Sequence, residues 1–202
     1  MDISTEAQLR ARYKSPSERA VRKQLAALDP HARNFIAHSP FLVLGTAGAD
    51  GSVDVSPKGD APGFVAVVDD HTVLVPDRPG NNRLDGLRNV LENPHVGLIF
   101  FIPGVDETLR VNGRARVTTD AALLAPLAVQ GKVPATGLVV EVEEVFLHCA
   151  KALIRSRLWD PATRIERASF PTLGRMLADQ IGGMDAEEAD RYTQQAYRDT
   201  LY

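Results

Sequence analysis

The side chains best suited to chemistry in this 202-residue sequence are concentrated between residues 53 and 83. Hydroxyl, amide and cationic donors occur there at short spacing, at Ser56, Lys58, Arg78, Asn82 and Arg83. A helix N-terminus presents free backbone N–H groups and a partial positive charge, and neighbouring cations strengthen its attraction for a phosphate. The pattern therefore indicates a phosphate site, although on composition alone such a turn is more often a solvated loop that caps a helix.

Predicted strands and one predicted helix position these donors. β-branched and aromatic residues indicate strands at 53–55, 64–68 and 71–75, with a break at 59–63. A tight turn is expected at Asp69-Asp70. The polar run 76–83 then leads to a helix that Asn81 or Asn82 is expected to cap. Its shared apolar face would consist of Leu84, Leu87, Val90 and Leu91.

The remaining segments are likewise predicted to be strands and helices. Further strands are expected at 41–46, 97–101, 109–117, 138–142 and 145–150. Helices are expected within 5–37, at 119–127, at 171–181 and at 185–201. In the second of the N-terminal helices, an apolar stripe is expected from Val21, Leu25 and Leu28. Strands that recur every eight to twelve residues or so favour a small antiparallel barrel over a parallel sheet.

Composition excludes several classes of protein. A net charge of −3 gives no basic footprint for nucleic acid, and no run of about 18 apolar residues indicates a membrane span. The single cysteine, Cys149, excludes an intrachain disulfide and a cysteine metal cluster, which suits a cytoplasmic protein. We expect Cys149 to be a small buried hydrophobe, facing away from His148. No dinucleotide-binding or P-loop glycine motif occurs.

Four motifs in order resemble the pyridoxamine 5′-phosphate oxidase-like, FMN-binding split-barrel family. They read S-P-K-G (56–59), P-D-R-P-G-N-N-R (76–83), N-P-H-V (93–96) and L-R-V-N-G-R-A (109–115). The likeness covers about Phe41 to Glu144 and is closer to the uncharacterised flavoprotein branch than to the vitamin-B6 oxidase.

The resemblance implies a mainly β fold with flanking α-helices, a six-stranded Greek-key split β-barrel. It further implies a single domain over 1–202, with a helical lead at 1–38, the barrel core at 39–162 and a helical extension at 163–202. The expected assembly is a homodimer with FMN bound at the interface between the two subunits.

The resemblance also assigns site residues. Ser56 and Lys58 would lie along the flavin, and Asn82 and Arg83 would hold its phosphate. Further lining would come from Pro76, Asp77 and Arg78. Across the dimer interface, Arg155 and Trp159 would contact the flavin; the alternative is a tryptophan packed at the barrel end among surface cations. The vitamin-B6 oxidase has two consecutive basic residues where this chain has Asn82-Arg83, and its substrate-binding arginine and histidine are not evident. Pyridoxamine phosphate is therefore not the expected substrate.

The implied function is an FMN-dependent oxidoreductase that transfers hydride through flavin N5 to or from an unidentified small molecule. No catalytic acid or base and no metal ligand is assigned. One alternative is a non-catalytic flavin- or haem-binding sensory protein, in which an axial haem ligand would come from His38, His71, His95 or His148. Another alternative is a purely structural dimer with an empty barrel.

Overall fold

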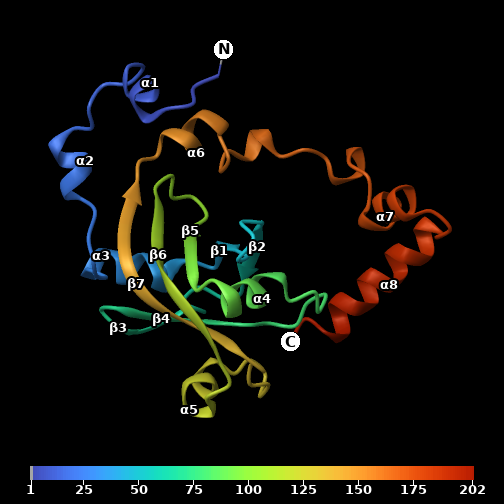
Figure 1. Ribbon diagram of the computed structural model, residues 1–202. Helices are drawn as coiled ribbons and strands as arrows, with labels where there is room; N and C mark the ends of the chain where they lie inside the picture. The colour runs from blue at the N-terminus through green and yellow to red at the C-terminus, as the bar shows by residue number, and fades with distance from the viewer. Residues whose placement is uncertain (1) are drawn as a thin grey trace.

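One curved antiparallel sheet of seven strands forms the body of the protein (Figure 1). The computed structural model describes residues 2–202. The strands are β1 (Phe41–Ala47), β2 (Val53–Gly59), β3 (Ala66–Asp69), β4 (Thr72–Pro76), β5 (His95–Phe101), β6 (Thr108–Thr118) and β7 (Gly137–His148). They are ordered β2-β1-β5-β6-β7-β4-β3, so the chain crosses over between β2 and β3 and again between β4 and β5.

The core lies inside this curved sheet, and β1, β5 and most of β6 alternate buried side chains with more exposed ones. In β1, Leu42 and Leu44 point inward, and Leu98 and Phe100 of β5 meet them from the neighbouring strand. Burying such side chains contributes about 1.5–3 kcal/mol each. β2 and β3 form the two free edges of the sheet, which does not close, as expected for a split barrel. The predicted split-barrel fold is thus confirmed.

Eight α-helices and three short 3₁₀ turns, all within residues 2–202, flank the sheet. The helices are α1 (Glu6–Arg10), α2 (Glu18–Arg22), α3 (Pro30–His38), α4 (Asp85–Glu92), α5 (Ala121–Leu124), α6 (Lys151–Ser156), α7 (Leu173–Ile181) and α8 (Ala186–Asp199). The 3₁₀ turns are η1 (Ala125–Leu127), η2 (Pro161–Thr163) and η3 (Arg167–Ser169). Figure 1 shows α7 and α8 as an arm that extends away from the barrel and returns toward it. In residues 2–202 no helix is long and apolar enough to cross a membrane.

Capping side chains account for most helix starts. Thr5 forms a capping box with Gln8 at the start of α1, and the Asp29 carboxylate accepts the Ala32 N–H at 2.8 Å at the start of α3. Asp185 caps α8 in the same way, as expected from the sequence. α3 turns Phe35 and Ile36 into the barrel core.

The strand count of six is wrong because the edge hairpin β3–β4 adds a short seventh strand, β3. The turn of that hairpin lies at Asp70-His71, one residue later than expected. The two strands expected at 138–142 and 145–150 are one strand, β7. A β-bulge allows β7 to continue: Asn112 pairs with Glu144 and Gly113 pairs with Val142, which leaves one extra residue between them.

Two smaller expectations also fail. The second N-terminal helix ends at Arg22, because Leu25 pairs with Val145 of β7 through two backbone hydrogen bonds of 3.0 and 2.8 Å. This pairing provides hydrogen-bond partners for both the N–H and the C=O of Leu25. The residue therefore does not need the hydrogen bonds of a helix. Cys149 is exposed rather than buried, since β7 ends at His148 and the chain leaves the sheet there.

Candidate functional site

A cavity of about 740 Å³ lies where β2, the loop after β4 and the start of α4 meet. Its apolar lining residues include Leu44, Leu87, Val133, Pro134 and Ala135. The same lining carries four cations and two carboxylates: Lys58, Arg78, Arg83 and Lys132, with Asp77 and Asp85. The lining thus combines apolar side chains with an excess of two positive charges, which suits an amphipathic anion of cofactor size.

Two ion pairs beside this cavity connect the end of β2 with the loop after β4. Lys58 Nζ lies 3.0 Å from Asp77 Oδ1, and Arg78 Nε lies 2.7 Å from Asp60 Oδ2. β2 and β4 are not neighbours in the sheet, so these contacts join its opposite parts. They fix the two cations at the cavity wall.

Asp60 is the most buried charged group of this region, with 2% of its side chain exposed. Burial opposes its ionisation, but hydrogen bonds from the Ala61 N–H and the Tyr202 hydroxyl and the nearby Arg78 guanidinium outweigh that effect and lower the pKa of Asp60. The carboxylate is therefore charged at neutral pH and holds Arg78 in place. Arg78 also donates from Nη1 to the Leu127 carbonyl at 2.9 Å.

The loop from Asn81 to Leu84 turns sharply before α4. Asn82 and Leu84 have left-handed backbone conformations, with φ of 57° and 61°. Asn81 does not cap the helix as expected; its side-chain oxygen accepts the Arg83 N–H at 3.0 Å within the loop. Leu84 is the N-cap and supplies no side-chain hydrogen bond. The first N–H groups of α4 therefore lack a capping side chain, and the residues that carry them line the cavity.

Leucine rarely adopts a left-handed conformation, and the strain at Leu84 amounts to about 1–2 kcal/mol. Leu84 is 50% exposed, so its replacement loses little burial. We expect Leu84→Gly to raise Tm by about 2 °C. The same change at Leu91, an exposed position inside α4, should instead cost about 1 kcal/mol. Thermal unfolding followed by circular dichroism distinguishes the two, and equal losses would show that Leu84 is unstrained.

Six of the nine residues predicted for the site line this one cavity: Ser56, Lys58, Asp77, Arg78, Asn82 and Arg83. Ser56 and Lys58 point the same way because they are two residues apart on β2. Pro76 does not line the cavity; it is buried at the end of β4, opposite Gly137. Arg83 pairs with Asp85 at 2.8 Å and is otherwise largely exposed.

Arg155 and Trp159 lie outside the cavity within one chain. Both follow β7, on α6 and the turn after it, which Figure 1 shows at the opposite end of the barrel from the C-terminus. Trp159 Nε1 donates to the Val105 carbonyl at 2.9 Å, so the ring packs against the loop between β5 and β6. That Arg155 and Trp159 contact a flavin bound mainly by a second subunit therefore stays a prediction.

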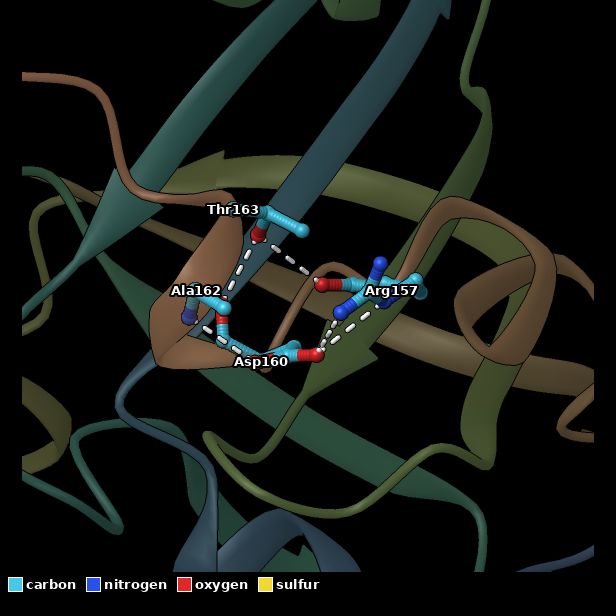
Figure 2. Close-up of polar contacts among 4 residues, drawn as sticks. All are labelled: Arg157, Asp160, Ala162 and Thr163. Atoms are coloured by element: carbon cyan, nitrogen blue, oxygen red, sulfur yellow. Dashed lines mark hydrogen bonds and ion pairs between the residues drawn. The ribbon is translucent and has the colours of Figure 1, made fainter.

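The turn that carries Trp159 is nevertheless well fixed (Figure 2). The Asp160 carboxylate accepts hydrogen bonds from the Ala162 N–H at 2.8 Å and from Arg157 Nε at 3.0 Å. The Thr163 hydroxyl lies within hydrogen-bond distance of two carbonyls, those of Arg157 at 3.1 Å and of Asp160 at 2.8 Å. Arg157 itself ends α6 in a left-handed conformation. This network holds the Trp159 backbone in one position.

Sequence reasoning missed three parts of the site: Asp60, the loop 132–136 and Tyr202. Asp60 stood in a segment interpreted only as a break between strands. The loop 132–136 lies between the helix expected at 119–127 and the strand expected at 138–142, and its lysine at position 132 is the one signal it carries. Tyr202 carries no local signal, because it reaches the cavity from far along the chain.

No histidine of residues 2–202 lines the large cavity. His95 borders a second, shallower hollow of about 390 Å³, which residues of β1, β5 and β6 also line. There Gly45 and Gly97 pair across β1 and β5 and leave the sheet without side chains. Arg114 Nη1 lies 3.1 Å from His95 Nε2 beside it. The larger cavity therefore offers no imidazole for axial haem ligation.

A family model described as pyridoxamine 5′-phosphate oxidase matches residues 28–149, which is more than half of the sequence. The chain belongs to the pyridoxamine 5′-phosphate oxidase family. The matched range runs from just before α3 to the end of β7. It contains the cavity residues of β2, of the loop after β4 and of α4. The resemblance found in the motifs is thereby confirmed. No match exists among the curated proteins.

A comparison with solved structures finds 57 chains that match this chain. A HupZ variant from Group A Streptococcus is 18% identical, covers 59% of this chain and 98% of its own, and superposes with a TM-score of 0.50. An FMN-binding protein from Syntrophomonas wolfei is 12% identical over 58% of this chain and 81% of its own, with a TM-score of 0.44. The haem storage protein HutZ from Vibrio cholerae is 16% identical over 60% and 93%, with a TM-score of 0.41. The likeness to HupZ supports the fold and nothing further.

Proposed function

We propose that this protein is an FMN-binding flavoprotein that transfers hydride through flavin N5 to or from a small molecule. The observation that carries the proposal is the cavity itself. Its lining combines cations, among them Arg83 and Lys58, with the first residues of α4, which have no capping side chain. A phosphate monoester carries about −1.5 to −2 charges near pH 7, which matches the excess of two positive charges in the lining.

The lining residues divide into two groups that fit the two ends of FMN. Asn82, Arg83 and the first N–H groups of α4 would hold the phosphate, because helix dipole and guanidinium act there together. Leu44, Leu87 and Val133 would cover the apolar ring system. When bound, FMN supplies the hydride-accepting and hydride-donating chemistry. The chain's own part is to orient the cofactor, exclude water with the apolar lining residues and place the Lys58 cation beside it.

A second copy of the chain is part of the proposal. β2 is an edge strand that turns its polar residues inward and its valines outward, with Val53 68% and Val55 66% exposed. An apolar, unpaired strand edge is a liability unless another surface covers it. A homodimer would cover it and would allow Arg155 and Trp159 of one subunit to approach the cofactor of the other.

The exposed Cys149 suits a reducing compartment, and we place the protein in the cytoplasm.

The phosphate assignment is tested by comparing FMN with riboflavin, which lacks the phosphate. We expect the wild-type protein to retain FMN through gel filtration and to show the isoalloxazine absorbance bands. Arg83→Ala should weaken FMN binding about tenfold, the effect of one charge-assisted hydrogen bond, and leave riboflavin binding unchanged. Isothermal titration calorimetry with both ligands measures this difference.

Arg88→Ala is the matched control. Arg88 is an exposed arginine of α4 that does not line the cavity, so its loss changes net charge equally and should leave FMN affinity as it is. Equal loss of FMN and riboflavin affinity in Arg83→Ala would contradict the placement of the phosphate. A colourless wild-type protein that takes up no FMN would contradict the proposed function as a whole, and a Soret band would instead indicate haem.

A further inference from the structure

The C-terminal arm returns to the cavity through a single residue. After α6 the chain leaves the barrel, forms α7 and α8, and comes back so that its end lies near the loop before α4 (Figure 1). Tyr202 there lines the same cavity as Arg78, Lys58 and Lys132. The tail, defined as residues 200–202, therefore contributes Tyr202 to the lining of the cavity.

Tyr202 is held by groups that themselves belong to the cavity wall. Its hydroxyl donates to Asp60 Oδ1 at 2.8 Å, and Asp60 binds Arg78 through its other oxygen. The Arg78 guanidinium lies 5.8 Å from the centroid of the Tyr202 ring, within range of a cation–π contact. Lys132 Nζ donates to the Tyr202 carbonyl oxygen at 2.5 Å. Side chain and backbone of Tyr202 are thus both anchored.

The rest of the arm makes no such contact. In the described chain, the two bonds of Tyr202 are the only hydrogen bonds that join residues 165–202 to residues 2–164. α7 and α8 are packed on each other instead: a Cβ at Gly174 would lie 2.4 Å from the Ala186 carbonyl oxygen, and the Gly174 N–H donates to Asp190 Oδ1 at 2.8 Å. The helical pair is a compact unit whose far end is fastened to the cavity by Tyr202.

We propose that the tail is a latch over the cofactor cavity, with Tyr202 as the positioning residue that fastens it to Asp60, Arg78 and Lys132. The proposal rests on the FMN-binding function proposed above. With the latch fastened, Tyr202 occupies part of the rim, and a bound cofactor leaves only when the tail moves aside. Release of FMN is then limited by opening of the tail as well as by the contacts of the cofactor itself.

The test compares Tyr202→Phe with Tyr197→Phe in the full chain. Tyr202→Phe keeps the ring and removes the hydrogen bond to Asp60. Tyr197 is 61% exposed on α8 and has no side-chain hydrogen bond to the barrel, which makes it the matched control. Two readouts are used: hydrogen–deuterium exchange of residues 186–202 without cofactor, and the rate of FMN release after dilution, followed by flavin fluorescence.

We expect Tyr202→Phe to release FMN about tenfold faster and to lose exchange protection in the tail, the scale set by one charge-assisted hydrogen bond. Its Tm should fall by only a few degrees, because residues 2–164 keep their core and Asp60 keeps its bonds to the Ala61 N–H and to Arg78. Tyr197→Phe should behave as the wild type in both readouts. Equal release rates in a wild type and a Tyr202→Phe variant that both bind FMN would overturn the latch alone. A wild type that takes up no FMN would overturn the proposed function and, with it, the role of the tail in retention.

Discussion

Gly113→Ala is expected to destabilise the protein by about 3 kcal/mol or more, at the upper end of the range for overpacking. A Cβ at position 113 would lie 2.0 Å from the Glu141 carbonyl oxygen and 3.0 Å from its carbon. Both are backbone atoms of β7, which is paired with β6 on both sides of the bulge. They can move only if that pairing opens. Urea unfolding followed by tryptophan fluorescence measures the loss as a lower midpoint.

Gly45→Ala provides the control for this prediction. Gly45 also lies inside a strand of the same sheet, but its nearest atom to a new Cβ is the Gly97 carbonyl oxygen at 3.7 Å, an ordinary contact. Alanine there should leave stability unchanged or raise it slightly, because glycine is the weaker residue in a strand. Similar midpoints for the two variants would mean that the bulge tolerates a side chain and that β6 and β7 are less tightly paired.

The bulge illustrates what the sequence alone could not predict. Strand positions follow from β-branched runs, and the segments 41–46, 97–101 and 109–117 were located from these alone. A bulge depends on which residues of two strands face each other, and β6 and β7 are separated by α5 and its loop. For the same reason 138–142 and 145–150 were interpreted as two strands: Glu143-Glu144 look like a break until Glu144 is seen opposite Asn112.

The candidate site, too, was predictable only where its residues lie close together in the sequence. Ser56, Lys58, Arg78 and Arg83 were predictable because they lie in one short segment with a distinctive order of residue types. Asp60 and Tyr202 are 142 positions apart, and only folding makes them neighbours. The helix cap was mispredicted because Asn81 uses its side chain within the loop, a local competition that composition does not decide.

Arg78→Ala is expected to destabilise the protein by about 3 kcal/mol at pH 7. The Arg78 and Asp60 side chains are only 16% and 2% exposed, and removing one partner of a buried pair leaves the other charge uncompensated. The hydrogen bonds from Ala61 and Tyr202 remain, which keeps the loss at the lower end of the range for such pairs. Arg175→Ala, which breaks an exposed pair with Asp179, should cost less than 1 kcal/mol.

The pH dependence separates this electrostatic cause from lost packing. In the wild type the pKa of Asp60 lies below its usual value of 3.8, so its ionisation stabilises the fold above that pH and the contribution fades as pH falls through the lowered pKa. Without Arg78 the buried carboxyl binds its proton at a higher pH, which removes the uncompensated charge. The stability difference between wild type and Arg78→Ala should therefore shrink below about pH 4, as measured by urea unfolding.

Adding Asp60→Asn to Arg78→Ala completes the argument. Asparagine keeps an acceptor for the Ala61 N–H and the Tyr202 hydroxyl but carries no charge to leave unpaired. The double variant should recover most of the lost stability at pH 7, and its stability relative to the wild type should change little between pH 7 and pH 4. If Arg78→Ala is as unstable at pH 4 as at pH 7, and Asp60→Asn rescues nothing, then Arg78 stabilises the fold through its packing and its bond to the Leu127 carbonyl.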